Sequence, residues 1–141
     1  MNSSIKIDFA SVKDIKELSE IEKTINKEHS WWIITRKYEF RQLIDKKRIV
    51  VAKQEGVIAG YANFKKPTGK KEKFIWLEDI YVKKEFRKRH VARAIIYYII
   101  KHFDIKHMAL LTPNRNMKIF KKMGFKKSVN WMNLYLRKTK E

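Results

Sequence analysis

Cysteine is absent from this 141-residue chain, and glycine and proline are scarce, with 4 and 2 residues. The lack of cysteine excludes a disulfide framework, a cysteine nucleophile and a thiolate metal site. The few glycines and prolines argue against a linker-rich or disordered chain. No apolar run approaches the length of a membrane-spanning helix, and the N-terminus lacks a signal-peptide pattern. We therefore expect a cytoplasmic protein without a membrane span.

Acidic residues are also few, because 15 Asp and Glu face 34 Lys and Arg, for a formal net charge of +19. Such a charge favours anionic partners: nucleic acid, an acidic protein, an anionic membrane surface or a phosphate-bearing ligand. The alternative is a solvated, lysine-rich surface without a specific partner. Hydrophobic residues make up 44% of the chain, enough to bury a core. We expect one domain spanning residues 1–141.

Hydrophobic periodicity predicts an α/β or α+β fold, a sheet with helices on both faces. The run at 95–100 favours a strand on propensity, but we interpret it as helix because the basic segment before it needs a helix to orient its N–H groups. Ser11 and Asp14 resemble a capping box that opens the first helix. The remaining predicted strands are 5–9, 49–52, 57–64, 74–82, 107–111 and 131–136, and the remaining helices are 35–44 and 114–123.

Residues 77–96 are the most informative segment, because they combine an apolar strand, a short basic loop and the start of a helix. Free N–H groups at a helix N-terminus form a site for phosphate. Four cations, Arg87, Lys88, Arg89 and Arg93, add positive charge at the same place. A solvated surface or a nucleic-acid patch is the alternative. The position between strand and helix favours phosphate binding.

The order of residues in this loop, Arg87-Lys88-Arg89-His90-Val91-Ala92, resembles the acetyl-CoA-binding segment of the GNAT N-acetyltransferase family, Arg/Gln-x-x-Gly-x-Gly/Ala. His90 stands where that family usually has Gly. The hairpin at 53–61 and the segment 119–125 resemble two further parts of the family, in the same order. The resemblance implies a mixed, mostly antiparallel sheet with a splayed central strand pair, and transfer of an acetyl group from acetyl-CoA to a primary amine.

The resemblance also implies roles for individual residues. Glu78 and Asp79 are the candidate bases, and Glu78 matches the family position better, although neighbours on a strand face opposite ways unless a bulge intervenes. Phe120 occupies the place of a Tyr that serves many relatives as general acid, and Phe has no proton to give. The cofactor-binding residues implied are Ile80, Tyr81 and Val82 for pantetheine, Arg87, Lys88, Arg89, His90, Val91, Ala92 and Arg93 for pyrophosphate, and Asn114 and Phe120.

The acceptor and the partners stay open at this stage. Trp31 and Trp32 fall in the loop that frames the acceptor site in this fold, or else pack under the helices. The four histidines show no ligand spacing, so no metal is expected. The second hypothesis is a GNAT-fold module that binds coenzyme A or RNA without turnover, and the third is an unrelated nucleic-acid-binding domain. A homodimer is compatible with the sequence.

Overall fold

The computed structural model describes residues 4–29, 34–66, 74–110, 117–127 and 132–135. A seven-stranded sheet runs through the molecule in the order β1-β2-β3-β4-β5-β7-β6. Only β4 and β5 pair in parallel, and the other neighbours are antiparallel, so the predicted mixed, mostly antiparallel sheet is confirmed. The strands are β1 Lys6–Phe9, β2 Ile49–Gln54, β3 Val57–Lys65, β4 Phe74–Val82, β5 His107–Leu110, β6 Lys126–Lys127 and β7 Met132–Tyr135.

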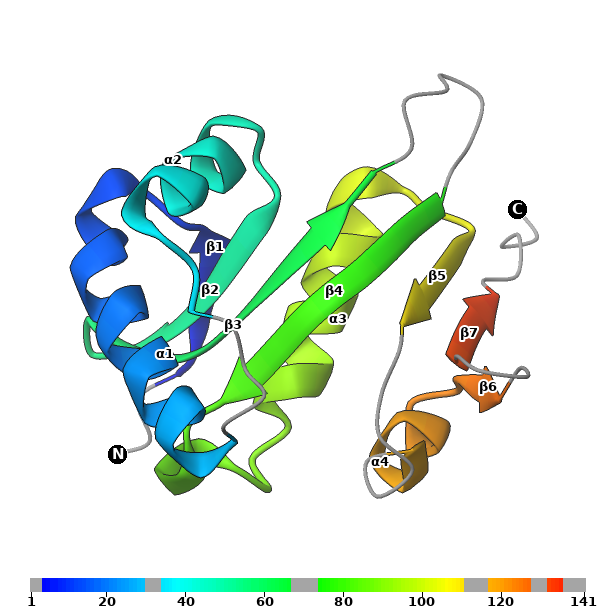
Figure 1. Cartoon of the computed structure of the whole chain (residues 1–141). Helices are drawn as coiled ribbons and strands as arrows, with labels where there is room; N and C mark the ends of the chain where they lie inside the picture. Colours follow the sequence, from blue (N-terminus) through cyan, green and yellow to red (C-terminus); the bar gives the residue numbers. More distant parts are fainter. Residues whose placement is uncertain (1–3, 30–33, 67–73, 111–116, 128–131, 136–141) are drawn as a thin grey trace.

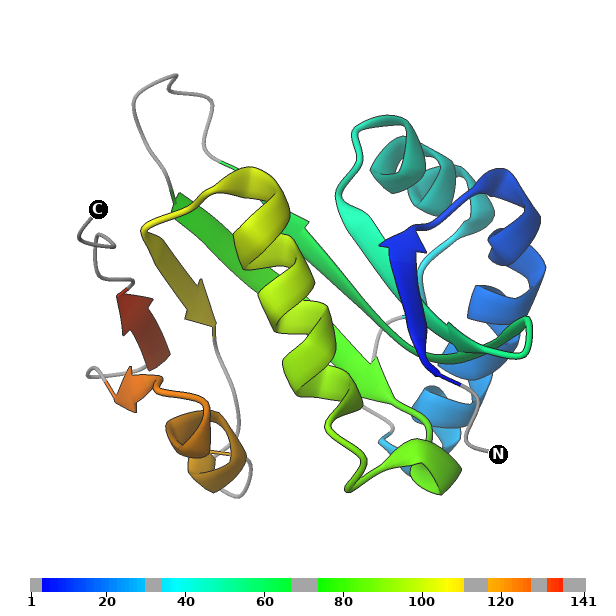
Figure 2. The ribbon, with the colours of Figure 1, turned by 180° about the vertical axis from the view of Figure 1, so that it is seen from behind.

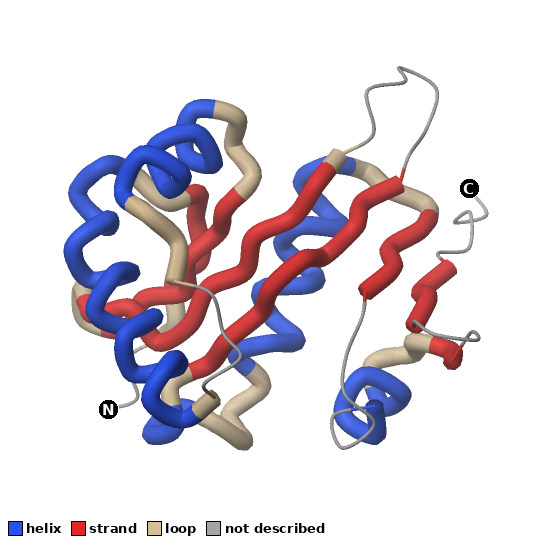
Figure 3. Tube along the Cα trace, in the orientation of Figure 1, coloured by secondary structure: helices blue, strands red, loops and turns tan. Residues whose placement is uncertain are grey.

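Helices cover both faces of the sheet, as predicted. Two of them, α1 and α2, lie on one face (Figure 1), and α3 crosses the other, which Figure 2 shows from behind. The tube in Figure 3 shows the strands passing between these two layers. The helices are α1 Ile15–Glu28, α2 Lys37–Asp45, α3 Val91–Phe103 and α4 Met117–Lys122, with 3-10 turns at Val12–Asp14 and Lys84–Phe86.

The first helix begins as the capping box predicts. The Ser11 N–H donates to Asp14 Oδ2 at 2.8 Å, and a 3-10 turn leads directly into α1. The ambiguous run at 95–100 lies inside α3. Val91, Ile95 and Ile99 are buried four residues apart, while Tyr97 is 45% exposed. Burial of one stripe on a 3.6-residue period, rather than β propensity, therefore decides this segment.

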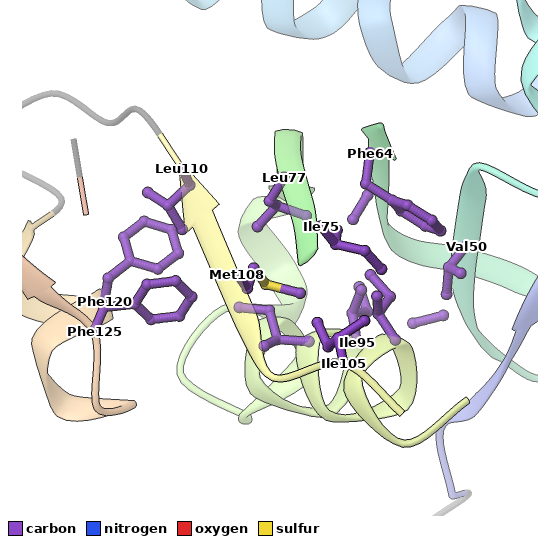
Figure 4. Close-up of a cluster of buried hydrophobic side chains, with 14 of the residues drawn as sticks. Val50, Phe64, Ile75, Leu77, Ile95, Ile105, Met108, Leu110, Phe120 and Phe125 are labelled. Atoms are coloured by element: carbon purple, nitrogen blue, oxygen red, sulfur yellow. The ribbon is translucent and has the colours of Figure 1, made fainter. Parts of the chain in front are cut away.

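Each face of the sheet has its own hydrophobic core. The core under α3 includes Phe64, Leu77, Ile95 and Met108, and Phe120 and Phe125 extend it toward α4 (Figure 4). The core under α1 and α2 includes Leu18, Ile25, Phe40 and Tyr61. Unlike the first, the second core encloses a charged residue, Glu22, whose side chain is fully buried.

Candidate functional site

The pairing of β4 with β5 stops halfway along β4. Phe74 to Leu77 pair with His107 to Leu110, and residues 78–82 continue beyond the described end of β5. Figure 1 shows β4 running on past the described end of β5. Among the described residues, the second half of β4 therefore has no β5 partner, as the predicted splayed central pair requires.

The backbone of this second half of β4 presents hydrogen-bonding groups toward the splay. The Lys83 N–H donates to Ala59 O at 2.8 Å, which fixes the phase of the β3–β4 ladder. Bonding alternates along an antiparallel pair, so the groups of Ile80 and Val82 point to the β5 side. In agreement, Val82 O accepts a bond from Arg87 Nε at 2.9 Å on that side.

A bulge decides which acid faces which layer. The register shifts between Asn63 and Phe64, so that Asn63 pairs with Asp79 while Phe64 pairs with Leu77. Glu78 is the extra residue. Ile80 and Val82 contact the α3 core, whereas Tyr81 contacts the α1–α2 core. By alternation Asp79 shares the face of Tyr81.

Asp79 lies in surroundings that disfavour its charged form. Burial raises its pKa to about 6, and the carboxylates of Glu22 and Glu78 add to the rise. A hydrogen bond from the Asn63 side chain opposes it. A carboxyl with a raised pKa, on the half of β4 that has no β5 partner among the described residues, has a property that a general base needs.

Glu78 is placed differently. Its carboxylate forms an ion pair with Lys65 Nζ at 2.9 Å, and a third of its side chain is exposed. The structure thus separates the two candidate acids by environment, one paired with a surface lysine and one in the polar part of the α1–α2 core.

Around Asp79, polar side chains form a row across β3 and β4, in which the buried Tyr61 and Asn63 stand opposite the half-buried Tyr81 and Asp79. The Tyr61 hydroxyl donates to Glu22 Oε2 at 2.8 Å, and burial, followed by the charge of Glu22, raises the pKa of Tyr61 far above its usual value. Glu22 also accepts from the Thr35 N–H at 2.6 Å and the Thr35 hydroxyl at 3.0 Å, just before α2.

Sequence reasoning did not include Glu22 or Asn63 in the site. The signal for Glu22 was its place in the apolar stripe of α1, between Ile21 and Ile25, where a charge needs a partner. Asn63 carried the same signal, as a polar residue between Ala62 and Phe64 in a buried strand.

The basic loop joins β4 to α3 with two residues in left-handed conformation. Lys88 has φ 66° and His90 φ 61°, and His90 directly precedes the first residue of α3. No side chain among the described residues caps this helix start. The first N–H groups of α3, from Val91, Ala92 and Arg93, are therefore available to an anion.

The arginines of the loop are exposed but take different directions. Arg87 is tied back to the strand through Val82 O, lies 5.4 Å from the centre of the Tyr81 ring and comes within 4.0 Å of Glu28. Arg89 lies over Phe86, and Arg93 contacts Tyr97 one turn along α3. Of the cations that were predicted to bind phosphate, Arg87 thus already has a hydrogen-bond partner at the end of β4.

Between α1 and the end of β4 lies a groove of about 300 Å³. Tyr81 and Ile21 line it together with acidic side chains, in contrast to the basic molecule as a whole. The lining residues are Glu17, Glu20, Ile21, Thr24, Glu28, Tyr81, Lys83, Lys84 and Glu85.

The remaining predicted site residues lie elsewhere. Phe120 is 7% exposed and packs edge-on against Phe125, with ring centres 5.6 Å apart. Asn114, Trp31 and Trp32 fall outside the described residues. Within the described ranges, no three His, Asp or Glu side chains gather in a way that could hold a metal ion. No helix in those ranges is long and apolar enough to cross a membrane.

Solved structures share this arrangement. PaiA N-acetyltransferase from Thermoplasma acidophilum, in complex with coenzyme A, has a TM-score of 0.78 at 16% identity, over 94% of this chain and 99% of that one. N-acetylglutamate synthase from Neisseria gonorrhoeae, complexed with coenzyme A and N-acetyl-glutamate, has a TM-score of 0.80 at 12% identity, over 98% of this chain and 36% of that one. The ribosomal-protein-S18-alanine N-acetyltransferase from Escherichia coli has a TM-score of 0.73 at 14% identity, over 98% and 97%.

At these identities the likenesses show the fold. No curated protein sequence matches the chain. A family model does: the Acetyltransferase (GNAT) family model matches residues 12–125, from the first turn of the N-terminal helix to the end of α4 and the buried Phe125. With the splayed β4–β5 pair and the loop-to-helix junction after β4, this match establishes that the chain belongs to the GNAT acetyltransferase family.

Proposed function

We propose that the protein is an acetyl-CoA-dependent N-acetyltransferase that acts on a primary amine, with Asp79 as the base. The observation that carries the proposal is the place of Asp79. Its side chain is half-buried, its pKa is raised to about 6, and it stands on the half of β4 that continues past the described end of β5. Glu78, whose charge is matched by Lys65, lacks these properties.

The residues present fit coenzyme A. The start of α3 and the exposed Lys88, Arg89 and Arg93 offer N–H groups and positive charge to the pyrophosphate. The outward backbone groups of Ile80 and Val82 suit the amide-rich pantetheine arm, although Val82 O is shared with Arg87. Coenzyme A bound there would bring a thioester to the same stretch of strand as Asp79.

The chemistry asked of Asp79 is removal of one proton from the bound ammonium group. Its carboxylate becomes a neutral acid, and the freed nitrogen lone pair attacks the thioester carbonyl, forming a C–N bond as the C–S bond breaks. A raised pKa makes the carboxylate a better proton acceptor at neutral pH. The nitrogen loses its second proton to solvent as the amide forms, and the thiolate takes a proton from solvent or from another group, because Phe120 has none.

Release of free thiol tests the proposal directly. Because the chain has no cysteine, a thiol reagent reports only coenzyme A. Wild type is mixed with acetyl-CoA and n-butylamine, lysine amide or a tripeptide with a free N-terminus. We expect Asp79→Asn to lower kcat/KM by roughly 100-fold or more and Glu78→Gln to change it less than fivefold. A larger loss of kcat/KM in Glu78→Gln than in Asp79→Asn would identify Glu78 as the base.

Phe120 favours a second candidate function, a module that binds coenzyme A without turnover. In that case acetyl-CoA would raise the melting temperature, and Arg89→Glu would abolish the rise, while no amine in the panel released thiol above the rate without enzyme. Thiol release by wild type that Asp79→Asn removes would exclude this second function.

A further inference from the structure

We propose that Asn63 is a binding residue for the acceptor, and that its Oδ1 and the Asp79 carboxylate together accept the N–H groups of a primary ammonium ion. The inference rests on the proposed function, because it names the groups that hold the amine in the same site. It concerns a residue on β3, the neighbouring strand, to which the family resemblance gave no role.

The first observation is an orphaned polar atom. Asn63 is 4% exposed, and its Oδ1 has no hydrogen-bond partner, the only such atom among the buried side chains of the described residues. A buried polar atom without a partner destabilises the folded state, so folded proteins rarely leave one. A ligand that donates a hydrogen bond would complete it.

The second observation is the register. Asn63 stands directly opposite Asp79 in the β3–β4 ladder, and the two side chains share a hydrogen bond. Because Oδ1 is free, the amide nitrogen of Asn63 must be the donor in that bond. The bond orients the Asn63 amide and leaves its oxygen beside the carboxylate.

The chemistry of the pair selects the ligand. An amide oxygen and a carboxylate are two acceptors with one negative charge, and a primary ammonium ion offers three N–H donors and one positive charge. Once Asp79 has taken a proton, Oδ1 still accepts an N–H from the neutral amine. Asn63 therefore holds the nitrogen while its lone pair becomes free, which Asp79 alone does not do.

The Tyr61 hydroxyl, by contrast, already has a partner. Like Thr35, it donates to Glu22. Tyr61→Phe is thus a matched control: it removes one buried polar atom from the same strand and face, two residues from Asn63, without touching the proposed ammonium contacts.

The experiment measures binding of n-butylammonium, lysine amide and the tripeptide to wild type and variants saturated with coenzyme A. We expect saturable binding by wild type, a Kd at least tenfold higher for Asn63→Leu, and a change below twofold for Tyr61→Phe. n-Butanol, of similar shape but uncharged, should not compete. Asn63→Ala repeats the test if Asn63→Leu does not fold.

Where wild type turns over, two further readouts apply. KM for the amine should rise in Asn63→Leu more than kcat falls. The acidic limb of the kcat/KM profile should move to higher pH, because the Asn63 bond holds the pKa of Asp79 down against burial and against the charges of Glu22 on α1 and Glu78 on β4.

Equal ammonium binding by wild type and both Asn63 variants would overturn the inference, as would absence of saturable binding by every amine. If Asn63→Leu were more stable than wild type and bound the amines unchanged, water or the protonated Asp79 would be the hydrogen-bond donor to Oδ1. The proposed function fails separately: amine binding that depends on Asn63 without thiol release would leave the inference standing and remove the catalysis.

Discussion

His90 carries a conformation that suits glycine better. Its φ of 61° lies in the left-handed region, where a side chain with a Cβ costs roughly 1 kcal/mol. It stands where the family motif has Gly, and its C=O accepts from Ala94 N–H in the first turn of α3 at 3.0 Å. The loop therefore has a left-handed residue at the position where the motif has Gly, and His90 adopts this conformation at an energetic cost.

We expect His90→Gly to raise the free energy of unfolding by about 0.5–1 kcal/mol and to keep or improve acetyl-CoA affinity. Urea unfolding and calorimetric titration measure the two effects. Ala94→Gly, inside α3, is the control, and should lower stability by about 1 kcal/mol. A tenfold loss of affinity in folded His90→Gly would mean that the imidazole itself contacts the ligand.

Asp79 makes stability depend on pH. Its folded pKa of about 6 exceeds the ordinary aspartate pKa of 3.8, so the folded state binds the proton more tightly than the unfolded chain. Stability therefore falls as pH rises from about 4 to 6, and the full penalty of burying the charge is present above pH 6. Asp79→Asn removes the penalty and keeps an acceptor for the Asn63 amide.

We expect Asp79→Asn to be more stable than wild type at pH 8, by roughly 1–3 kcal/mol, and the difference to shrink toward zero near pH 4. Urea unfolding at pH 4, 6 and 8 measures it. Glu78→Gln provides the comparison at the neighbouring position, where Lys65 pairs with the carboxylate. A gain that is the same at all three pH values would contradict the raised pKa.

The sequence alone could not decide between Glu78 and Asp79 as the base, because the orientation of each side chain depends on strand register. Two adjacent acids on a strand face opposite ways, but which one faces the α1–α2 layer depends on the bulge opposite Asn63 and Phe64. A bulge is a property of two strands in register, and residues 74–82 alone do not encode it. The orphaned Asn63 likewise becomes visible only once Asp79 stands opposite.

At the scale of elements, the close contact of β3 and β4 depends on Gly60. It pairs with Val82, and a Cβ at this position would lie 2.7 Å from Tyr81 O, a backbone atom that cannot turn aside. The two strands approach this closely just before the basic loop. Gly60 thus links the hairpin to the position of the proposed pyrophosphate site.

We expect Gly60→Ala to lower the free energy of unfolding by roughly 1–3 kcal/mol and to weaken acetyl-CoA binding, because the end of β4 must move. Thermal melts with and without acetyl-CoA report both. Gly56→Asn is the control: its φ of 80° is tolerated best by Asn, and no atom lies within 4 Å of an added Cβ. An unchanged affinity for acetyl-CoA in Gly60→Ala would show that the basic loop keeps its position without the close contact of β3 and β4.

Most elements follow from local pattern, and their relative placement does not. Hydrophobic periods of 2 and 3.6 residues predicted most strands and helices to within a few residues, because a strand buries one face and a helix buries one stripe. The predicted strand at 107–111 ends at Leu110 within the described residues. The splay of β4 from β5 came from the family resemblance, since no property of Ile80 or Val82 alone marks an unpaired edge.

The whole molecule divides its charge unevenly. Several acidic side chains are matched by lysine or arginine, as in the pair of Lys53 and Asp14 at 2.6 Å, although the sequence carries 19 more positive than negative charges. The acidic groove beside Tyr81 is a local exception. Long-range attraction therefore favours polyphosphate ligands, while a cationic amine meets local negative charge in the groove beside α1.

The salt dependence of binding should show how much the positive charge of the protein contributes to acetyl-CoA affinity. We expect acetyl-CoA affinity to fall threefold to tenfold between 50 and 500 mM NaCl, because the cations of the basic loop are exposed and screened, and thermal stability to rise as self-repulsion weakens. S-acetyl-pantetheine, which lacks the diphosphate, is the control ligand, and its affinity should stay constant. Nonspecific binding of single-stranded RNA should disappear over the same range, since it depends on phosphate contacts alone. An acetyl-CoA affinity as insensitive to salt as that of S-acetyl-pantetheine would place the diphosphate away from Lys88, Arg89 and Arg93.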